Sequence, residues 1–315
     1  MPYRNTEEVS LQKISNFRHN YKDQGEKGVN GQNIMSNLRD YDEHCKTYDN
    51  VRFADGADVM SYMVKGMLKM DPSKIHMLEA GCGTGNYSLA LIENGIGKLT
   101  LLDASSGMLE KAKSKLSKYK DRVVEVKQHH LPHIPFADDT FDACTFIQVL
   151  HHLDVSKEEK NVSNYNNAEK AIVEAYRVLK PGGVLVIDHF FRQNIDAFFS
   201  PSLAPKANAY LRQVYMDEED LIHVLRKKGF GNISYVSQPG SYSNKGYLEI
   251  ENLLNPNWRK SDCLWQILEE SGELDSLLKL LQKHKDEATL IHFAHDFYQL
   301  NRKVGEHTML FAQKL

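Results

Sequence analysis

The expected fold is decided by residues 79–86, which read EAGCGTGN. This stretch follows a strand-like apolar run and precedes a helix that we expect to begin near Tyr87. Glycines let a backbone turn tightly and approach a ligand to a distance that a β-carbon would block. The N-terminus of the helix behind them offers free N–H groups. A purely structural tight turn also explains such a stretch, so the glycines alone do not establish a binding site.

An acid follows the glycines at a spacing that suits a nucleoside site. Asp103 ends the next strand-like run, 103 − 85 = 18 residues beyond Gly85. A carboxylate at this position can accept hydrogen bonds from both hydroxyls of a ribose that lies across the strand ends. The alternative is a helix cap, because a helix is entered through Ala104 and Ser105. Taken with the glycines, the acid favours a bound nucleoside.

Strands and helices alternate around this motif. Strand-like runs are expected at 75–79, 99–103, 123–126, 143–149, 184–188, 233–236 and 307–313, and helical patterns at 57–68, 107–118, 169–179 and 217–228. Such alternation predicts an α/β fold with a mostly parallel sheet and helices on both faces. We expect Pro181-Gly182-Gly183 to turn the chain into the fifth strand, and Gly229 to end the preceding helix. The last two strands suit an antiparallel edge hairpin.

The chain divides into four expected parts. Residues 1–55 form an arm or lid with a weak helical pattern, and 56–244 form the α/β core. Residues 245–303 read as a helical insertion over the substrate, and 304–315 return to the core as its last strand, antiparallel to the rest.

Composition excludes several classes of partner. Hydrophobic residues make up 41% of the chain and charged residues 26%, and the net charge is −3. A chain without a large positive net charge has no overall electrostatic attraction for a nucleic acid. The polar opening MPYRNTEEVS lacks a signal peptide's apolar run, and no stretch approaches the ~18 apolar residues of a membrane span. We therefore predict a cytoplasmic protein without membrane association. Four scattered cysteines without a CxxC pair argue against structural zinc and against a disulfide framework.

Further motifs make the chain resemble the class I, Rossmann-like, S-adenosylmethionine-dependent methyltransferases. LEAGCGTG at 78–85 looks like that family's first motif and LLDAS at 101–105 its ribose-binding strand. Residues 131–153, LPHIPFADDTFDACTFIQVLHHL, resemble its third and fourth strand region, and 175–188, AYRVLKPGGVLVID, its fifth. The resemblance covers roughly residues 45–190 and the final strand.

The resemblance implies S-adenosylmethionine as cofactor, S-adenosylhomocysteine as product, and a small-molecule acceptor with an N or O nucleophile. The residues it places at the methionine part are Glu79, Gly81, Cys82, Gly83 and Gly85, with Asp103 at the ribose. Those it places at the adenine are Ala104, Ser105, Met108, His130 and Leu131. His130 departs from the family, which usually has an acidic residue there. Ile147 and Gln148, at the end of the fourth strand, complete the crevice.

A segment upstream also resembles the family. Residues 48–52, YDNVR, look like the segment by which many members cover the cofactor. The resemblance puts Tyr48 near the reactive methyl group and lets Arg52 pair with a carboxylate. A packing contact at a helix start is the alternative.

Histidines offer a candidate catalytic group. We expect His151 to emerge near the methyl group, where an imidazole could position or deprotonate a nucleophile. His152 lies beside it, and the histidines of 129–133 raise the possibility of a metal site. No carboxylate or cysteine stands at the usual ligand spacing, so no metal is expected.

Two rival functions remain from the sequence. A nicotinamide-dependent oxidoreductase shares the glycine turn and the acid, but the chain has GxGxG where that class has GxGxxG. A non-catalytic protein that binds S-adenosylmethionine is the second rival. Neither the acceptor nor the oligomeric state can be derived from the sequence.

Overall fold

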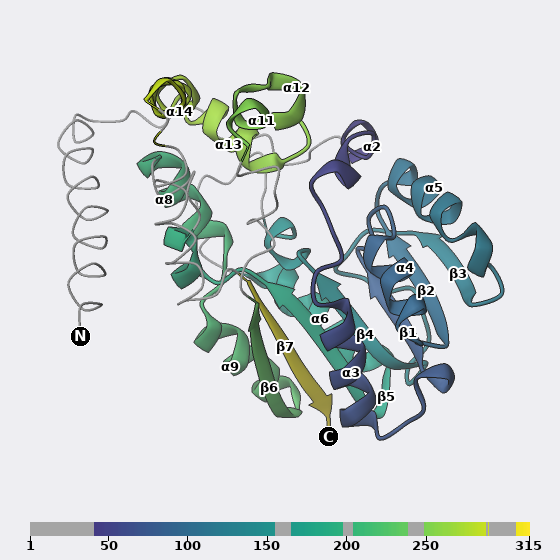
Figure 1. The fold of residues 1–315 in the computed structure, drawn as a ribbon. Coiled ribbons are helices and arrows are strands. Elements are labelled where there is room, and N and C mark those ends of the chain that lie inside the picture. The colour runs from purple at the N-terminus through teal and green to yellow at the C-terminus, as the bar shows by residue number, and fades with distance from the viewer. Residues whose placement is uncertain (1–40, 155–164, 198–203, 239–248, 288, 290–306) are drawn as a thin grey trace, which may run out of the picture.

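The computed structural model describes residues 41–154, 165–197, 204–238, 249–287, 289 and 307–315. At its centre is a seven-stranded sheet with the order β3-β2-β1-β4-β5-β7-β6 (Figure 1). Within the sheet β7 pairs antiparallel with both β5 and β6, and the other pairs are parallel. The predicted α/β fold, including its antiparallel last strand, is confirmed.

The strands lie close to their predicted positions. They are β1 His76–Ala80, β2 Lys98–Asp103, β3 Val123–Gln128, β4 Phe141–Ile147, β5 Leu179–His189, β6 Phe230–Gln238 and β7 His307–Lys314. The central strands are continuous apolar runs because helices cover both of their faces. In β4 every residue is buried.

Helices cover the sheet in two groups. One face carries α3 Ala57–Leu68, α4 Asn86–Glu93 and α5 Ser106–Lys115, which share a core with β1 and β2. The other face carries α6 Asn166–Val178 and α9 Glu218–Lys228, packed around β4 and β5. Gly229 follows α9 with φ of 108°, which confirms it as the expected left-handed helix end.

One predicted turn is wrong in detail. Pro181, Gly182 and Gly183 lie within β5, which begins at Leu179, and the pairing of β4 with β5 shifts register between Phe141 and Ala143. Gly182 has φ of 78°, so the glycines form an irregularity inside the strand rather than a turn before it.

A third group of helices lies beyond the upper edge of the sheet in Figure 1. It comprises α8 Pro205–Val214, α11 Ile250–Leu254, α12 Pro256–Arg259, α13 Cys263–Glu270 and α14 Leu274–Asp286. Leu211 of α8 shares a core with Leu253, Trp265 and Leu281. We call these helices the cap. The described part of the predicted insertion is therefore helical, and α8, which precedes it in the chain, packs against it.

The predicted arm is described only at its end, by α2 Tyr41–His44 and the 3-10 turn η1 Tyr48–Asn50, because residues 1–40 lie outside the described part. None of the described helices is long and apolar enough to cross a membrane.

The topology fixes where a ligand site can form. Parallel strands end at the same edge of a sheet, and open α/β sheets bind ligands there. Because β7 runs the opposite way, its first residue, His307, begins at that edge. The described ends of the arm and of the cap lie over it (Figure 1).

Candidate functional site

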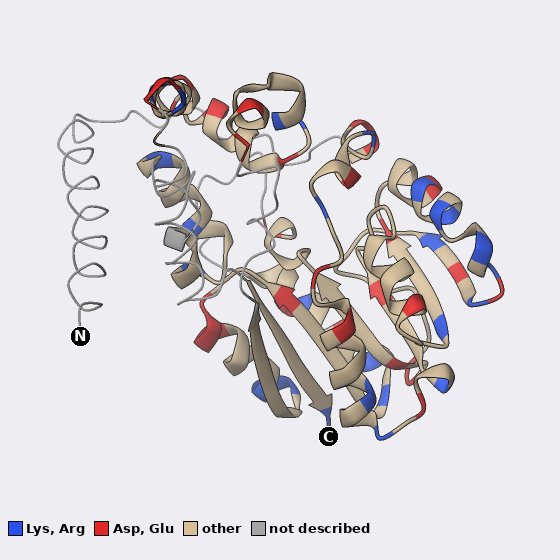
Figure 2. Ribbon diagram, viewed as in Figure 1, with Lys and Arg blue, Asp and Glu red and all other residues tan. Residues whose placement is uncertain are grey.

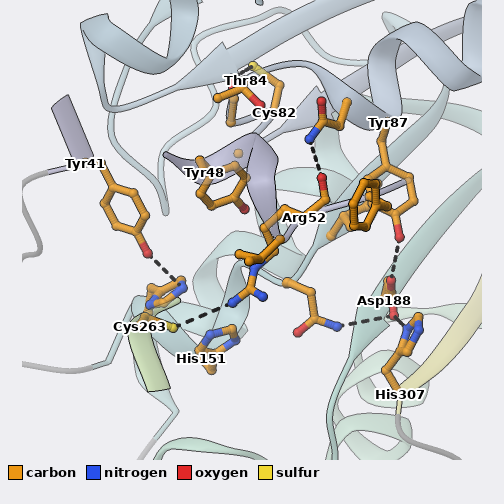
Figure 3. Close-up of a pocket in the computed structure, with 18 of the residues that line it drawn as sticks. Tyr41, Tyr48, Arg52, Cys82, Thr84, Tyr87, His151, Asp188, Cys263 and His307 are labelled. Atoms are coloured by element: carbon orange, nitrogen blue, oxygen red, sulfur yellow. Dashed lines mark hydrogen bonds and ion pairs between the residues drawn. The ribbon is translucent and has the colours of Figure 1, made fainter. Parts of the chain in front are cut away.

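A pocket that is open to solvent occupies the edge where β1, β4 and β5 end. The residues that line it come from the arm, the glycine turn, the strand ends and the cap (Figure 3). They are Tyr41, His44, Tyr48, Val51, Arg52, Phe53, Glu79, Gly81, Cys82, Gly83, Thr84, Asn86, Tyr87, Ile147, Gln148, His151, His152, Asp188, Phe190, Tyr215, Cys263 and His307. The predicted residues among them are Tyr48, Arg52, Glu79, Gly81, Cys82, Gly83, Ile147, Gln148 and His151.

The glycine turn is folded back on the neighbouring strand. The N–H groups of Gly81 and Cys82 both donate to the Leu102 carbonyl oxygen, at 2.7 and 3.0 Å. Gly83 has φ of 53°, and a β-carbon there would enter the space 3.8 Å from the Tyr48 ring. Gly85 instead packs away from the pocket, where a β-carbon would stand 3.0 Å from Ala112. Gly83 is thus the glycine whose missing side chain leaves room in front of the turn.

Glu79 is the penultimate residue of β1, beneath this turn, and its side chain is almost completely buried. Its carboxyl accepts a hydrogen bond from the Ser88 hydroxyl. Burial raises the pKa of Glu79 to about 8 because the charged form loses its hydration. Burial likewise raises the pKa of the neighbouring Cys82 thiol well above its ordinary value, which makes it a poor nucleophile.

Asp103 supports the turn from β2. Its two carboxylate oxygens accept from the Gly83 N–H at 2.8 Å and from the Ser105 N–H at 2.9 Å. Burial raises the pKa of Asp103. Ser105 in turn caps α5 by accepting from the Met108 N–H at 3.0 Å. The residue that caps α5 is thus Ser105 and not Asp103, which braces the turn before the helix. The role of Asp103 at a ribose stays a prediction.

The residues predicted beside adenine lie outside the lining of this pocket. Met108 is buried, Ala104 and His130 are exposed, and Leu131 is partly buried. Their contact with a cofactor remains a prediction. Asp42 of α2 lies over this side of the fold and accepts from the Ser105 hydroxyl at 2.5 Å.

The arm is bonded to the glycine turn. Asp49 accepts from the Thr84 hydroxyl at 2.5 Å, from the Asn86 amide at 3.1 Å and from the Lys115 ammonium at 3.0 Å. Tyr48, the preceding residue, is held over Gly83, and its surroundings raise the pKa of its phenol, chiefly through burial. The cofactor-covering role of Tyr48 and the packing alternative both stay predictions.

Arg52 links the arm to the cap. Its guanidinium lies 3.0 Å from the carboxylate of Asp262, whose side chain is 1% exposed, and 3.9 Å from the Cys263 sulfur. Asp262 also caps α13 through the Leu264 N–H at 2.9 Å. A role for Arg52 at a cofactor carboxylate stays a prediction, and Asp262 is a partner that the sequence did not indicate.

The end of β4 supplies the opposite wall. Gln148 takes a left-handed conformation, with φ of 53°, and its N–H donates to the Asp188 carbonyl at 2.9 Å. Non-glycine residues with positive φ are uncommon and concentrate at functional sites. The His151 ring lies 3.9 Å from the His152 ring and 4.6 Å from the Tyr215 ring, measured between centroids. His152 also bonds to the Tyr41 hydroxyl at 3.1 Å.

Asp188 joins several elements at one point (Figure 3). Its carboxylate lies 2.5 Å from Nδ1 of His307, 3.3 Å from the Gln148 amide and 3.4 Å from the Tyr87 hydroxyl. The sequence reasoning placed Asp188 and His307 only as strand ends. The signal that could have found them is direction, since an antiparallel last strand must begin where the parallel strands end.

Comparisons with known proteins agree with this geometry. A family model described as a methyltransferase domain matches residues 78–187. A ubiquinone/menaquinone biosynthesis C-methyltransferase, UbiE, of Haemophilus ducreyi is 28% identical over 181 residues, which are 50% of this chain and 65% of that protein. A demethylmenaquinone methyltransferase of Clavibacter sepedonicus is 29% identical over 216 residues, 62% of this chain and 82% of that protein. The aligned stretch thus spans slightly less than two thirds of the first relative.

A solved structure shares the fold. A protein assigned as a sarcosine dimethylglycine methyltransferase from Galdieria sulphuraria superposes with a TM-score of 0.51 at 14% identity, over 86% of this chain and 98% of that one.

The sheet order and the glycine turn that follows β1 are those of a Rossmann-like methyltransferase fold. The antiparallel β7 between β5 and β6 departs from the 3-2-1-4-5-6 strand order of the nicotinamide-binding sheet. The methyltransferase domain matched over residues 78–187, the sequence relatives and the fold together support a class I S-adenosylmethionine-dependent methyltransferase, a class whose cofactor is S-adenosylmethionine.

Proposed function

We propose that this chain binds S-adenosylmethionine in the pocket at the strand ends and transfers its methyl group to a small molecule. The observation that carries the proposal is that one pocket is lined both by the glycine turn with Glu79 and by the aromatic and histidine side chains of the opposite wall. The first wall suits the cofactor and the second suits an acceptor. Bound S-adenosylmethionine supplies a methyl group on a positively charged sulfur, which leaves with the electron pair of the broken carbon–sulfur bond.

The donor and acceptor groups present fit the cofactor. The space before Gly83 would admit the methionine part, and the Glu79 carboxylate would accept from its ammonium group. Tyr48 would cover this part from the arm. Asp103 would hold the ribose, with Ala104, Ser105, Met108, His130 and Leu131 on the adenine side and Ile147 and Gln148 opposite.

The chain's own residues then have to align the acceptor and exclude water. Alignment of reacting atoms within about 3 to 3.5 Å supplies much of the acceleration of such a displacement. The arm and the cap meet over the pocket through Arg52 and Asp262, so both contribute to closing it. His151 lies in the lining, where it would position or deprotonate the acceptor.

An N or O nucleophile is the acceptor atom that we propose first, because imidazoles in the lining suit an acceptor that loses a proton. A carbon acceptor is the second candidate. It is favoured by the likeness to one relative, which is a C-methyltransferase of ubiquinone and menaquinone biosynthesis.

An acceptor panel tests the proposal. S-adenosylhomocysteine binding is measured by calorimetry, and transfer of labelled methyl groups is measured with amines, phenols, hydroquinones and carboxylic acids. We expect binding of S-adenosylhomocysteine and a methylated product in at least one class, with the position of the methyl group read by mass spectrometry. Binding without transfer to any class would favour the non-catalytic alternative, and the absence of binding would overturn the proposal.

A further inference from the structure

The pocket wall contains a buried carboxylate–imidazole pair. Asp188, at the end of β5, is 1% exposed, and His307, at the start of β7, is 3% exposed. The distance from Nδ1 of His307 to the Asp188 carboxylate is 2.5 Å. A carboxylate has no proton to donate, so the imidazole must be the donor in this contact. In the neutral imidazole the proton therefore lies on Nδ1, and Nε2 is the basic nitrogen.

The pair is held rigidly. β5 and β7 are paired from Val184 to His189 and from Thr308 to Gln313, so the two side chains issue from adjacent strands of one sheet. The Gln148 amide and the Tyr87 hydroxyl also contact the Asp188 carboxylate. These contacts fix the orientation of the carboxylate, and through it that of the imidazole ring. Sites built on strands in this way are more accurately positioned than sites on loops.

We propose that His307 is the base that accepts the proton of a ring hydroxyl on an aromatic acceptor, and that Asp188 is its positioning residue. This inference rests on the function proposed above and names its acceptor class.

The acceptor oxygen forms a bond to the methyl carbon while the bond from that carbon to the cofactor's sulfur breaks and its electron pair remains on the sulfur. The hydroxyl proton of the acceptor passes to Nε2 of His307. The positive charge that the cofactor brings is thereby transferred to the imidazolium ion, which Asp188 stabilises at 2.5 Å. Release of that proton to solvent restores the neutral imidazole for the next turnover.

The lining favours a flat and neutral acceptor. Phe190 and Tyr215 both line the pocket, and the Phe190 ring centroid lies 5.8 Å from that of His307. Aromatic rings pack favourably at such distances. The Arg52 guanidinium near this wall faces the Asp262 carboxylate, and the Asp188 carboxylate is hydrogen-bonded to the His307 ring. A phenolic hydroxyl is also acidic enough for an imidazole to deprotonate it during transfer, whereas an aliphatic alcohol is much less acidic.

The chain contains a matched control for the pair. His133 lies 3.1 Å from Glu174 through the same Nδ1-to-carboxylate contact, but its side chain is 64% exposed and outside the pocket lining. The variants to compare are therefore His307→Asn, Asp188→Asn, His151→Asn and His133→Asn in the full chain. Asparagine retains a donor near the position of Nδ1 and lacks the basic nitrogen.

Two acceptors of different acidity show whether His307 acts as a base or only stabilises the structure. In a mildly alkaline buffer 4-nitrophenol is largely ionised and needs no base, whereas phenol keeps its proton. We expect His307→Asn to slow methylation of phenol by about 10² to 10⁴-fold and that of 4-nitrophenol by less than about tenfold. Equal losses with both acceptors, or a selective loss in His151→Asn instead, would overturn the inference. His133→Asn should match the wild type.

Two further readouts do not depend on turnover. S-adenosylhomocysteine affinity in His307→Asn should stay within about threefold of the wild type, a change of less than roughly 0.7 kcal/mol. Nitrogen NMR of the complex with S-adenosylhomocysteine should show His307 with its proton on Nδ1, a signature lost in Asp188→Asn. A wild-type His307 protonated on Nε2 would overturn the inference. A chain that binds S-adenosylhomocysteine and methylates acceptors other than phenols would overturn it too, while leaving the proposed function intact; failure to bind S-adenosylhomocysteine would overturn both.

Discussion

Glu79 carries a proton in the pocket at neutral pH because burial raises the pKa of its carboxyl to about 8. Since the folded-state value lies above the ordinary value of 4.5, ionisation of Glu79 opposes folding. The neutral carboxyl contributes its full stability below the ordinary pKa, and this contribution is lost as the pH rises toward about 8. An ammonium group placed beside it would favour the ionised form.

We therefore predict that S-adenosylhomocysteine binding near neutral pH releases up to about one proton from Glu79. Calorimetry in two buffers with different heats of ionisation measures this number. Glu79→Gln should remove the release. An observed binding enthalpy that is the same in both buffers for the wild type would contradict the assignment of Glu79 to the methionine end.

Asp103 is predicted to act on both binding and local structure. Asp103→Ala should weaken S-adenosylhomocysteine binding by about 1.5 to 3 kcal/mol, the range for hydrogen bonds to a charged group. Because its carboxylate also holds the N–H groups of Gly83 and Ser105, the substitution should lower the melting temperature as well. Calorimetry and thermal unfolding measure the two effects, with the exposed Asp121→Ala as control. An unchanged dissociation constant in the folded variant would refute the ribose assignment.

For single residues, the sequence predicted the features that depend only on neighbouring positions in the chain. The glycine turn could be located because positive φ angles and the strand before it are local features. The Asp188–His307 pair could not, because its members lie 119 residues apart and meet only through the pairing of β5 with β7. The left-handed Gln148 was also not foreseen, since a glutamine has no intrinsic preference for it.

Among the elements, all seven strands were located because each contains a short strand-like segment between turns or helical patterns. The departures have physical reasons. β5 continues through Pro181-Gly182-Gly183, where the sheet tolerates an irregular pairing. Helix α8 was missed because its apolar face packs on the other helices of the cap, the first of which, α11, begins 36 residues after α8 ends (250 − 214). Division of the chain at residues 244 and 303 remains a prediction.

The ion pair between Arg52 of the arm and Asp262 of the cap can be tested by substitution. Arg52→Ala leaves the Asp262 carboxylate buried without the opposite charge, which typically costs about 3 kcal/mol or more. We expect α13 to exchange its amide hydrogens faster in this variant, with S-adenosylhomocysteine affinity lowered through the released arm. Arg52→Ala combined with Asp262→Asn should recover part of the protection. Unchanged exchange in α13 would show that the ion pair does not hold the cap.

The whole molecule brings the arm, the sheet edge and the cap around one pocket. Figure 2 shows acidic and basic residues interspersed over the described helices, with basic residues gathered on α5. Lys115 is one of them, and it bonds to Asp49 of the arm. The predictions that the chain avoids nucleic acid and resides in the cytoplasm stay predictions.

Closure of the arm and the cap over the pocket should slow the exchange of their amide hydrogens. We predict that residues 1–50 and 245–303 become protected when S-adenosylhomocysteine and substrate bind, and that the Tyr48 and Arg52 end responds to the cofactor alone. For the described residues 41–52 and 249–287 the structure adds that Arg52 joins the two segments. We therefore expect S-adenosylhomocysteine alone to protect α13 together with the arm. Equal exchange of both segments in the free and bound protein would show that the site is preformed.

The central claim is methyl transfer from S-adenosylmethionine in the pocket at the strand ends. The most direct test incubates the full chain and a metabolite extract with S-adenosylmethionine carrying a deuterated methyl group, then searches by mass spectrometry for products that gain this group. Gly83→Val is the control, because its branched side chain would fill the space before the turn and resist a φ of 53°. We predict a labelled product with the wild type and none with a folded Gly83→Val variant. A wild-type chain that binds S-adenosylhomocysteine but labels nothing, or a variant that labels equally well, would contradict the account.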